Sequence, residues 1–188
     1  MEQNDISNKK KEISDEISRV VYVGGVIESK GCIEIIKVAE NFPNIEFRLV
    51  GKPEKKIMEI DKTPNVVLCG EKSKENVTKE LEEADIFIFV SYFVGEGFSN
   101  ALAEAMAKGL PCIVSDWAAN RDMIEDSGGS VVNIQDVNAI AEAITDLYDD
   151  KAKRQDQSEW NIKKVKENYI DNIVTDMYVD AYESLLTK

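Results

Sequence analysis

The stretch that decides the fold runs from residue 91 to residue 111 and reads SYFVGEGFSNALAEAMAKGLP. It follows an apolar run, residues 85–90 (DIFIFV), which is typical of a buried strand. Two glycines then allow a turn, a helix of small residues follows, and a Gly-Leu-Pro ends it before another apolar run. A strand, a turn and a helix at the carboxyl edge of a parallel sheet form a place where such folds bind anionic ligands. The sequence therefore predicts the functional site here.

The composition indicates a globular chain with one core. The 188 residues are 43% hydrophobic and 31% charged, and no apolar run approaches the roughly 20 residues of a membrane-spanning helix. The first eleven residues are polar and do not resemble a secretory signal, so we expect a cytoplasmic protein. The net charge of −13 argues against nucleic acid as a partner, because nucleic-acid binding needs basic surfaces.

Histidine is absent from the chain, which restricts the chemistry that its own side chains can supply. Without histidine, the Ser-His-Asp and Cys-His mechanisms and the commonest zinc ligand are excluded. A general acid or base must then be a carboxylate, a lysine or a tyrosine, or come from elsewhere. The three cysteines, Cys32, Cys69 and Cys112, show no CxxC spacing, and we expect buried, reduced thiols.

Short apolar segments alternate with helical segments, and most of the apolar segments end in glycine. The pattern predicts a doubly wound parallel α/β sheet of about six strands, Rossmann-like, in a single lobe. Residues 1–18 are expected to be a polar tail or linker, and residues 19–188 the lobe, with C-terminal helices over about 136–188. The expected strands are 19–23, 45–50, 65–69, 85–90, 112–114 and 130–134, and the earlier helices 31–42, 55–60, 75–84, one from about residue 99, and 120–126.

The loop after the first strand contains two glycines and a lysine. Gly24 and Gly25 allow the backbone to come close to a ligand, and Lys30 stands at the start of a helix, where an ammonium group suits a phosphate. A lysine at a helix start is also often simply solvated, and this alternative stays open. Lys52, in the loop after the second strand, is expected to lie in a solvated turn and to add a supporting charge.

The loop after the fourth strand offers backbone donors. Gly97, Phe98 and Ser99 precede the helix, so the backbone N–H groups of this segment lie at the positive end of the helix dipole. Ser99 or Asn100 is expected to be the N-cap.

Two glutamates flank the start of this helix. Glu96 lies just before it and Glu104 in its second turn, and each carboxylate can accept hydrogen bonds from ring hydroxyls. The helix is so rich in apolar residues that most of it is expected to be buried. Burying a carboxylate such as that of Glu104 is unfavourable unless the carboxylate has a binding partner. The alternative is that Glu104 and Lys108 form an exposed pair at i,i+4.

The segment EGFSNALAEAMA at residues 96–107, followed by Gly-Leu-Pro at 109–111, resembles the E-x7-E segment of group 1 retaining glycosyltransferases of the two-lobed GT-B type. The similarity extends over about residues 19 to 148. In that family the C-terminal lobe binds a nucleotide-sugar donor, and this chain resembles that lobe only.

The resemblance implies a role for each matching residue. Glu96 would contact the hydroxyls of the donor sugar and Glu104 the ribose. Lys30 would pair with the diphosphate, and the backbone amides near Phe98 to Asn100 would hold phosphate and sugar. The resemblance implies no metal and no cofactor beyond the nucleotide-sugar substrate. In catalysis, Glu96 and Lys30 are the expected contributors.

Two departures from the family pattern stand out. The family commonly has an arginine where this sequence has Gly25, so Lys30 must act alone or with another cation such as Lys52. The family's N-terminal lobe, which binds the acceptor, has no counterpart here, and residues 1–18 are too short and too polar to replace it.

The resemblance also carries expectations about partners. A separate lobe or partner chain would have to bind the acceptor, which is unknown and whose class we expect to be a glycan or lipid-linked glycan. That lobe would bring the protein to the inner membrane surface. We expect the chain alone to bind donor weakly and to transfer poorly or not at all.

Other functions remain open from the sequence. A nucleotide-sugar binding module without catalysis, working as one subunit of a split assembly, would share every motif above. A lobe of an epimerase or hydrolase of similar build would normally contain histidine or further acids in its cleft.

Overall fold

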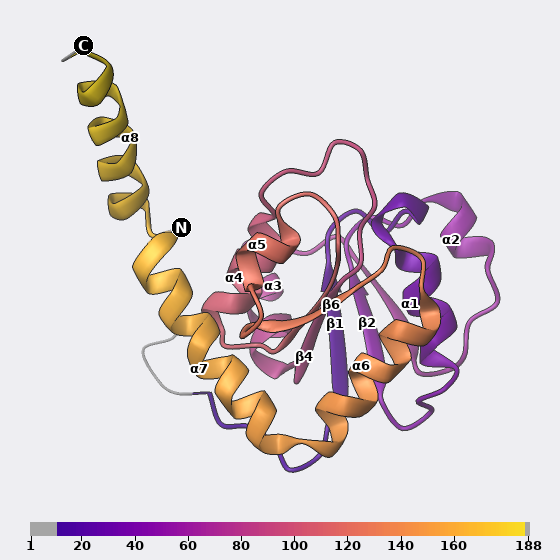
Figure 1. Ribbon diagram of the computed structural model, residues 1–188. Coiled ribbons are helices and arrows are strands. Elements are labelled where there is room, and N and C mark those ends of the chain that lie inside the picture. Colours follow the sequence, from indigo (N-terminus) through magenta and orange to yellow (C-terminus); the bar gives the residue numbers. More distant parts are fainter. Residues whose placement is uncertain (1–10, 187–188) are drawn as a thin grey trace.

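In the computed structural model, residues 11–186 are described and form a six-stranded parallel sheet in the order β3-β2-β1-β4-β5-β6 (Figure 1). The predicted fold class is therefore confirmed. The strands are β1 (Arg19–Val23), β2 (Glu46–Val50), β3 (Val66–Gly70), β4 (Ile86–Phe89), β5 (Cys112–Ser115) and β6 (Gly129–Val132). The helices are the 3-10 turn η2 (Glu28–Lys30) and α1 (Cys32–Ala39), α2 (Lys55–Glu59), α3 (Lys74–Glu83), α4 (Asn100–Ala107), α5 (Asn120–Ile124), α6 (Val137–Asp149), α7 (Lys151–Asn168) and α8 (Asp171–Leu186).

Helices cover both faces of the sheet. Figure 1 shows α1, α2 and α6 on one side and α3, α4 and α5 on the other, while α7 runs past the sheet and lies along α4. This is the arrangement that right-handed crossovers produce when the chain first builds β1 to β3 and then returns to the centre for β4 to β6. Both sides of the central strands are consequently buried.

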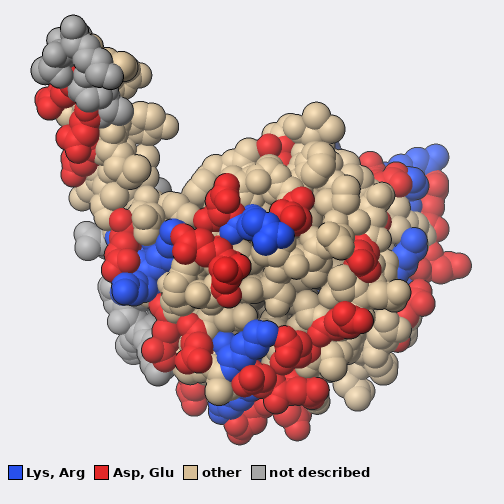
Figure 2. Space-filling view, in the orientation of Figure 1, with Lys and Arg blue, Asp and Glu red and all other residues tan. Residues whose placement is uncertain are grey.

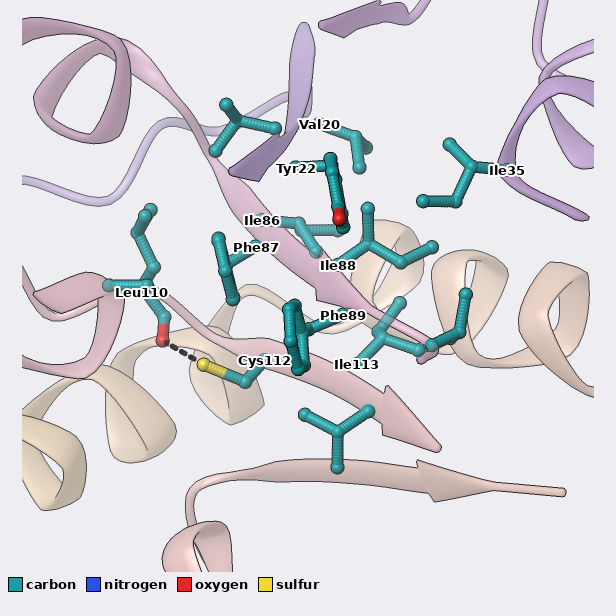
Figure 3. Packing of buried hydrophobic residues seen from close by; sticks show 14 of the residues in the cluster. Val20, Tyr22, Ile35, Ile86, Phe87, Ile88, Phe89, Leu110, Cys112 and Ile113 are labelled. Carbon is teal, nitrogen blue, oxygen red and sulfur yellow. Dashed lines mark hydrogen bonds between the residues drawn. The ribbon is translucent and has the colours of Figure 1, made fainter. Parts of the chain in front are cut away.

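The core lies on both faces of β1, β4 and β5. All four residues of β4 and of β5 are buried, as expected for parallel strands covered by helices on both sides. Figure 3 shows Phe87 and Phe89 beside Cys112 and Ile113, and the rings of Tyr22 and Phe89 are stacked with centroids 6.0 Å apart. The Cys112 thiol donates to the Leu110 carbonyl oxygen at 3.2 Å. A rigid central sheet of this kind fixes the loops at its carboxyl edge.

The segment before β1 is packed against the body. Ile13 and Ile17 are buried, and the guanidinium of the fully buried Arg154 donates to the carbonyl oxygens of Ser14 and Asp15 at 2.7 and 3.1 Å. Residues 11–18, which the sequence predicts to belong to a polar tail or linker, therefore contact the body at these positions. Residues 1–10 lie outside the described residues.

The two last helices differ in their packing. In α7 the buried side chains are mostly polar, and the Asn161 amide donates to the carbonyl oxygens of Leu110 and Gly128, both at 2.8 Å. Helix α8 extends away from the body (Figure 1), and Met177 and Leu185 on it are exposed. The prediction of C-terminal helices over about 136–188 is confirmed by α6, α7 and α8.

Two surface properties bear on partners. In the face shown in Figure 2, acidic side chains are spread widely, and lysines and arginines occur in small groups among them. Within residues 11–186, no helix combines the length and the hydrophobicity that crossing a membrane requires.

An ion cluster around the buried Glu80 joins α3 to β2. Arg48 on β2 donates to both carboxylate oxygens of Glu80 at 2.6 and 2.8 Å, and the Lys72 ammonium lies 3.0 Å from the same carboxylate. The hydrogen bonds from Arg48, assisted by Lys72 and opposed by burial, lower the pKa of Glu80 from 4.5 to about 2. A carboxylate with a depressed pKa stabilises the fold above its unfolded-state pKa and loses that contribution as the pH falls through its folded value.

We expect Glu80→Gln to lower the free energy of unfolding by roughly 3 kcal/mol at neutral pH, because a pKa difference of this size corresponds to about that much. The loss should shrink as the pH falls from 4.5 toward 2, where Glu80 becomes protonated in the folded protein too. Urea denaturation across this pH range measures both effects. Glu75→Gln, on the exposed face of the same helix, is the matched control. Equal midpoints for the two variants would show that the cluster does not stabilise the fold.

Candidate functional site

The loops after β1 and β4 meet at the centre of the sheet's carboxyl edge. The two strands are neighbours, and α1 covers one face of the sheet while α4 covers the other (Figure 1), which is the arrangement at which the binding crevice of open α/β sheets lies. The backbone N–H of Tyr92 donates to the Ser29 carbonyl oxygen at 2.9 Å and ties the loops together. This topological switch point is where open α/β sheets bind ligands.

Lys30 and Glu96 face each other across this crevice. The ammonium nitrogen of Lys30 lies 2.6 Å from Oε2 of Glu96, and the two side chains are 18% and 10% exposed. The hydroxyl of Ser91 donates to the same carboxylate oxygen, also at 2.6 Å. The ring of Phe93 lies under the lysine, with its centroid 4.7 Å from the ammonium nitrogen. The structure thus brings together two of the predicted site residues as one ion pair.

A chain of buried polar side chains supports this pair from below. The Ser115 hydroxyl donates to the Ser91 carbonyl oxygen at 2.5 Å, and the Asn120 amide donates to the Ser115 hydroxyl at 3.3 Å. The Trp117 indole N–H donates to the Phe93 carbonyl oxygen at 2.8 Å. These contacts fix the loop from which Glu96 projects. No sequence pattern predicts these roles of Ser91, Ser115, Trp117 and Asn120, because the contacts depend on β4 and β5 being neighbours.

The start of α4 opens onto the same crevice. Ser99 is the N-cap, and its hydroxyl accepts a hydrogen bond from the Leu102 N–H at 3.3 Å. The prediction of a cap at Ser99 or Asn100 is confirmed for Ser99. Gly97 and Asn100 are exposed, and the Phe98 side chain is 50% exposed. The first N–H groups of a helix have no intrahelical acceptor, so they can bind an anion at this end.

Glu104 lies one turn further into α4 and is partly buried, between buried apolar neighbours. Lys108, the partner in the alternative surface pair, lies 2.9 Å from the Glu82 carboxylate on α3.

The two glycines of the first loop border a hollow of about 370 Å³ at the carboxyl ends of β1 to β3. Gly24 has a φ of 151°, and the Gly25 carbonyl oxygen accepts a hydrogen bond from the buried Tyr22 hydroxyl at 2.9 Å. The hollow is lined by Val23, Gly24, Gly25, Val50, Gly51, Lys52, Glu71, Lys72 and Val77. The hollow presents backbone groups, apolar side chains and the ammonium groups of Lys52 and Lys72 beside the loop that carries Lys30.

The expectation of buried thiols is confirmed for Cys32 and Cys112, whereas Cys69 is only partly buried. Burial raises the pKa of Cys32 to about 12 and raises that of Cys112 further, so both stay protonated at neutral pH. Among the residues that the structure describes, Asp, Glu and Cys side chains form no group of three or more that could hold a metal ion.

Comparison with known proteins gives consistent matches. The family model described as "Glycosyl transferases group 1" matches residues 3–164. The capsular polysaccharide biosynthesis glycosyltransferase CapM from Staphylococcus aureus is 25% identical over 99% of this chain and 51% of its own length. The poly(glycerol-phosphate) alpha-glucosyltransferase from Bacillus subtilis is 26% identical over 85% of this chain and 26% of its own length. The chain therefore spans about half of CapM and less of the second relative.

Solved structures share the fold. HepE from Anabaena, in complex with UDP and glucose, superposes with a TM-score of 0.78 at 15% identity, over 90% of this chain and 49% of its own. The C-terminal domain of the group 1 glycosyltransferase LpcC from Francisella tularensis superposes with a TM-score of 0.69 at 18% identity, over 88% of this chain and 95% of that domain.

Proposed function

Because this chain belongs to the group 1 glycosyltransferases, we propose that it is the donor-binding lobe of a retaining enzyme that transfers a sugar from a nucleotide diphosphate sugar. The observation that carries the proposal is the Lys30–Glu96 pair, which lies in the switch-point crevice. A cation beside free helix amides suits a diphosphate, and a carboxylate next to it suits sugar hydroxyls.

In this proposal each group has one part of the donor to bind. Lys30 and the amides of Gly97 to Asn100 take the diphosphate, Glu96 takes hydroxyls of the sugar, and Glu104 takes the ribose. Without donor, Lys30 and Glu96 neutralise each other at 2.6 Å. When donor binds, phosphate oxygens replace the carboxylate as the partner of Lys30, and sugar hydroxyls replace the ammonium as donors to Glu96. Both charges therefore keep partners throughout.

The nucleoside would extend toward the hollow beside the first loop. Helices α3 and α4 lie on the same face of the sheet, so a ribose held by Glu104 directs the base toward Lys72 and Val77 on that side. Lys52, at the other wall of the hollow, supplies a second cation in a chain that has Gly25 at the family's arginine position.

The chemistry proposed is the replacement of one bond at the anomeric carbon. The bond to the phosphate oxygen breaks, a bond to an acceptor hydroxyl oxygen forms on the same face, the hydroxyl proton passes to a base of the second lobe or chain, and the nucleoside diphosphate leaves. The charge that develops on the leaving diphosphate is stabilised by Lys30 and the amides before α4, which are already oriented toward it. No residue of this chain is assigned as the base for the acceptor hydroxyl.

The acceptor is proposed to bind outside this chain. This chain spans about half of CapM, a glycosyltransferase of capsular polysaccharide biosynthesis, and about half of HepE, whose structure contains UDP and glucose. These relatives support a nucleotide-sugar donor and a glycan acceptor bound by a second lobe or chain. We propose that this chain alone binds donor and transfers poorly, because closure of a second lobe excludes water from the site.

A panel of nucleoside diphosphates and nucleotide sugars tests the proposal by thermal shift. Ligands of one base class, at about 100 times their Kd, should stabilise the protein by about 2.7 kcal/mol and raise its Tm by roughly 5 to 10 °C. Glu104→Ala should weaken that binding about 10- to 100-fold, since it removes a charged hydrogen-bond acceptor from the ribose.

Glu142→Ala is the matched control for this experiment, because Glu142 is an exposed glutamate on α6, away from the crevice. No stabilisation by any nucleotide, or equal binding by both variants, would contradict the proposed site. Transfer assays with the bound donor, with and without an acceptor-lobe polypeptide, separate an enzyme from a binding module.

A further inference from the structure

Phe98, in the loop that precedes α4, contacts Tyr169 at the C-terminal end of α7. The Phe98 ring packs against the Tyr169 ring with centroids 5.0 Å apart and an interplanar angle of 78°, an edge-to-face arrangement. Phe98 is the residue between Gly97 and the N-cap Ser99. The contact therefore acts on the segment that leads into the N-terminus of α4.

The backbone of Tyr169 is fixed by a helix, whereas the backbone of Phe98 lies in an irregular loop. Tyr169 ends α7, and its backbone N–H donates to the Val165 carbonyl oxygen at 2.9 Å. Helix α7 is fixed to the body by buried Val165 and by the two hydrogen bonds from the Asn161 amide. Phe98, in contrast, follows Gly95 and Gly97 in an irregular loop, where the backbone has the most conformational freedom.

The surroundings of Tyr169 also restrain its ring. Its side chain is partly buried, and burial raises the pKa of its hydroxyl, as do the nearby carboxylates of Glu125 and Asp122. Lys164, which pairs with Glu125, has the opposite effect on that pKa. Tyr169 also packs against the hydrophobic core, so its ring has contacts with the body as well as with the loop.

We propose that Tyr169 is a positioning residue for the donor site, holding Phe98 so that the amides of residues 97–99 face the donor diphosphate. This inference rests on the proposed function. Tyr169 does not contact the donor itself. Its effect passes through the aromatic contact, because rotation of the Phe98 backbone would turn neighbouring N–H groups out of the crevice. An aromatic pair of this geometry supports an effect of about three- to tenfold on affinity.

The test compares three variants by isothermal titration with the nucleoside diphosphate that the thermal-shift panel selects. Tyr169→Leu, which keeps an apolar side chain but removes the ring, should weaken binding about three- to tenfold. Tyr169→Phe, which keeps the ring, should bind as the wild type does. Phe98→Leu should weaken binding to the same extent, and the double variant should be no weaker than either single variant, because both remove one contact.

Tyr178→Leu is the matched control, since it makes the same change on α8 at a side chain that is 64% exposed. Amide hydrogen exchange at residues 97–99 in the nucleotide-bound protein is the second measurement, and it should be faster in Tyr169→Leu than in Tyr169→Phe. The proposal is overturned if Tyr169→Leu binds as the wild type does, if Tyr169→Phe loses as much, or if the losses add. If the wild type binds no nucleotide, the proposed function fails first and this inference fails with it.

Discussion

Replacing Lys30 by alanine is expected to weaken nucleoside diphosphate binding by roughly 30- to 1,000-fold, or about 2 to 4 kcal/mol. The variant loses the ammonium group proposed to bind the diphosphate. It also leaves Glu96, which is 10% exposed, with the Ser91 hydroxyl as its remaining partner among the contacts described above. A nearly buried carboxylate next to the phosphates then repels them, and the repulsion adds to the lost attraction. Isothermal titration with the selected nucleotide measures the effect.

Two further variants separate attraction from repulsion. Lys55→Ala removes the same charge from an 85% exposed lysine of α2 and should bind within about twofold of the wild type, as expected for a screened surface charge. The double variant Lys30→Ala/Glu96→Gln should recover part of the lost affinity, because the amide no longer repels the diphosphate. If Lys30→Ala binds as tightly as Lys55→Ala, the diphosphate does not bind at Lys30.

The fold was predictable because its signals are local. Each predicted strand is a short apolar run, and each observed strand lies within about two residues of its predicted bounds, since a parallel sheet buries both faces and needs such runs. The N-cap at Ser99 was predictable for the same reason, because a cap depends on a side chain and the backbone two or three residues away.

The contacts between residues of the site were not predictable, because they depend on the order of the strands in the sheet. Lys30 and Glu96 are 66 positions apart, and their pairing requires β1 and β4 to be neighbours. Arg154 shows the same limit: the first half of α7, residues 151–159, is almost entirely polar, so its sequence predicts no buried face around Arg154. Arg154 is nevertheless fully buried, because its donors satisfy backbone carbonyl oxygens of the segment before β1 and of the end of α6. Such partners are identified only after folding.

Gly31 allows the loop after β1 to approach the end of β4 closely. Gly31→Ala is therefore expected to lower the free energy of unfolding by about 2 to 5 kcal/mol. Its φ of 77° is left-handed, and a Cβ here would lie 2.3 Å from the Val90 carbonyl oxygen, a backbone atom that cannot rotate away. The loop carrying Lys30 would have to move from the end of β4, so we expect the Lys30–Glu96 pair to open as well. Urea denaturation measures the first effect and nucleotide titration the second.

Gly25→Ala is the matched control for that experiment, because Gly25 lies in the same loop and an added Cβ there meets no atom within 4 Å. Its denaturation midpoint should stay close to that of the wild type, since nothing has to move to accommodate the methyl group. If Gly31→Ala is as stable as Gly25→Ala, the loops after β1 and β4 do not depend on this close approach. If Gly31→Ala unfolds earlier but still binds nucleotide with wild-type affinity, the close approach stabilises the sheet edge without setting the geometry of the site.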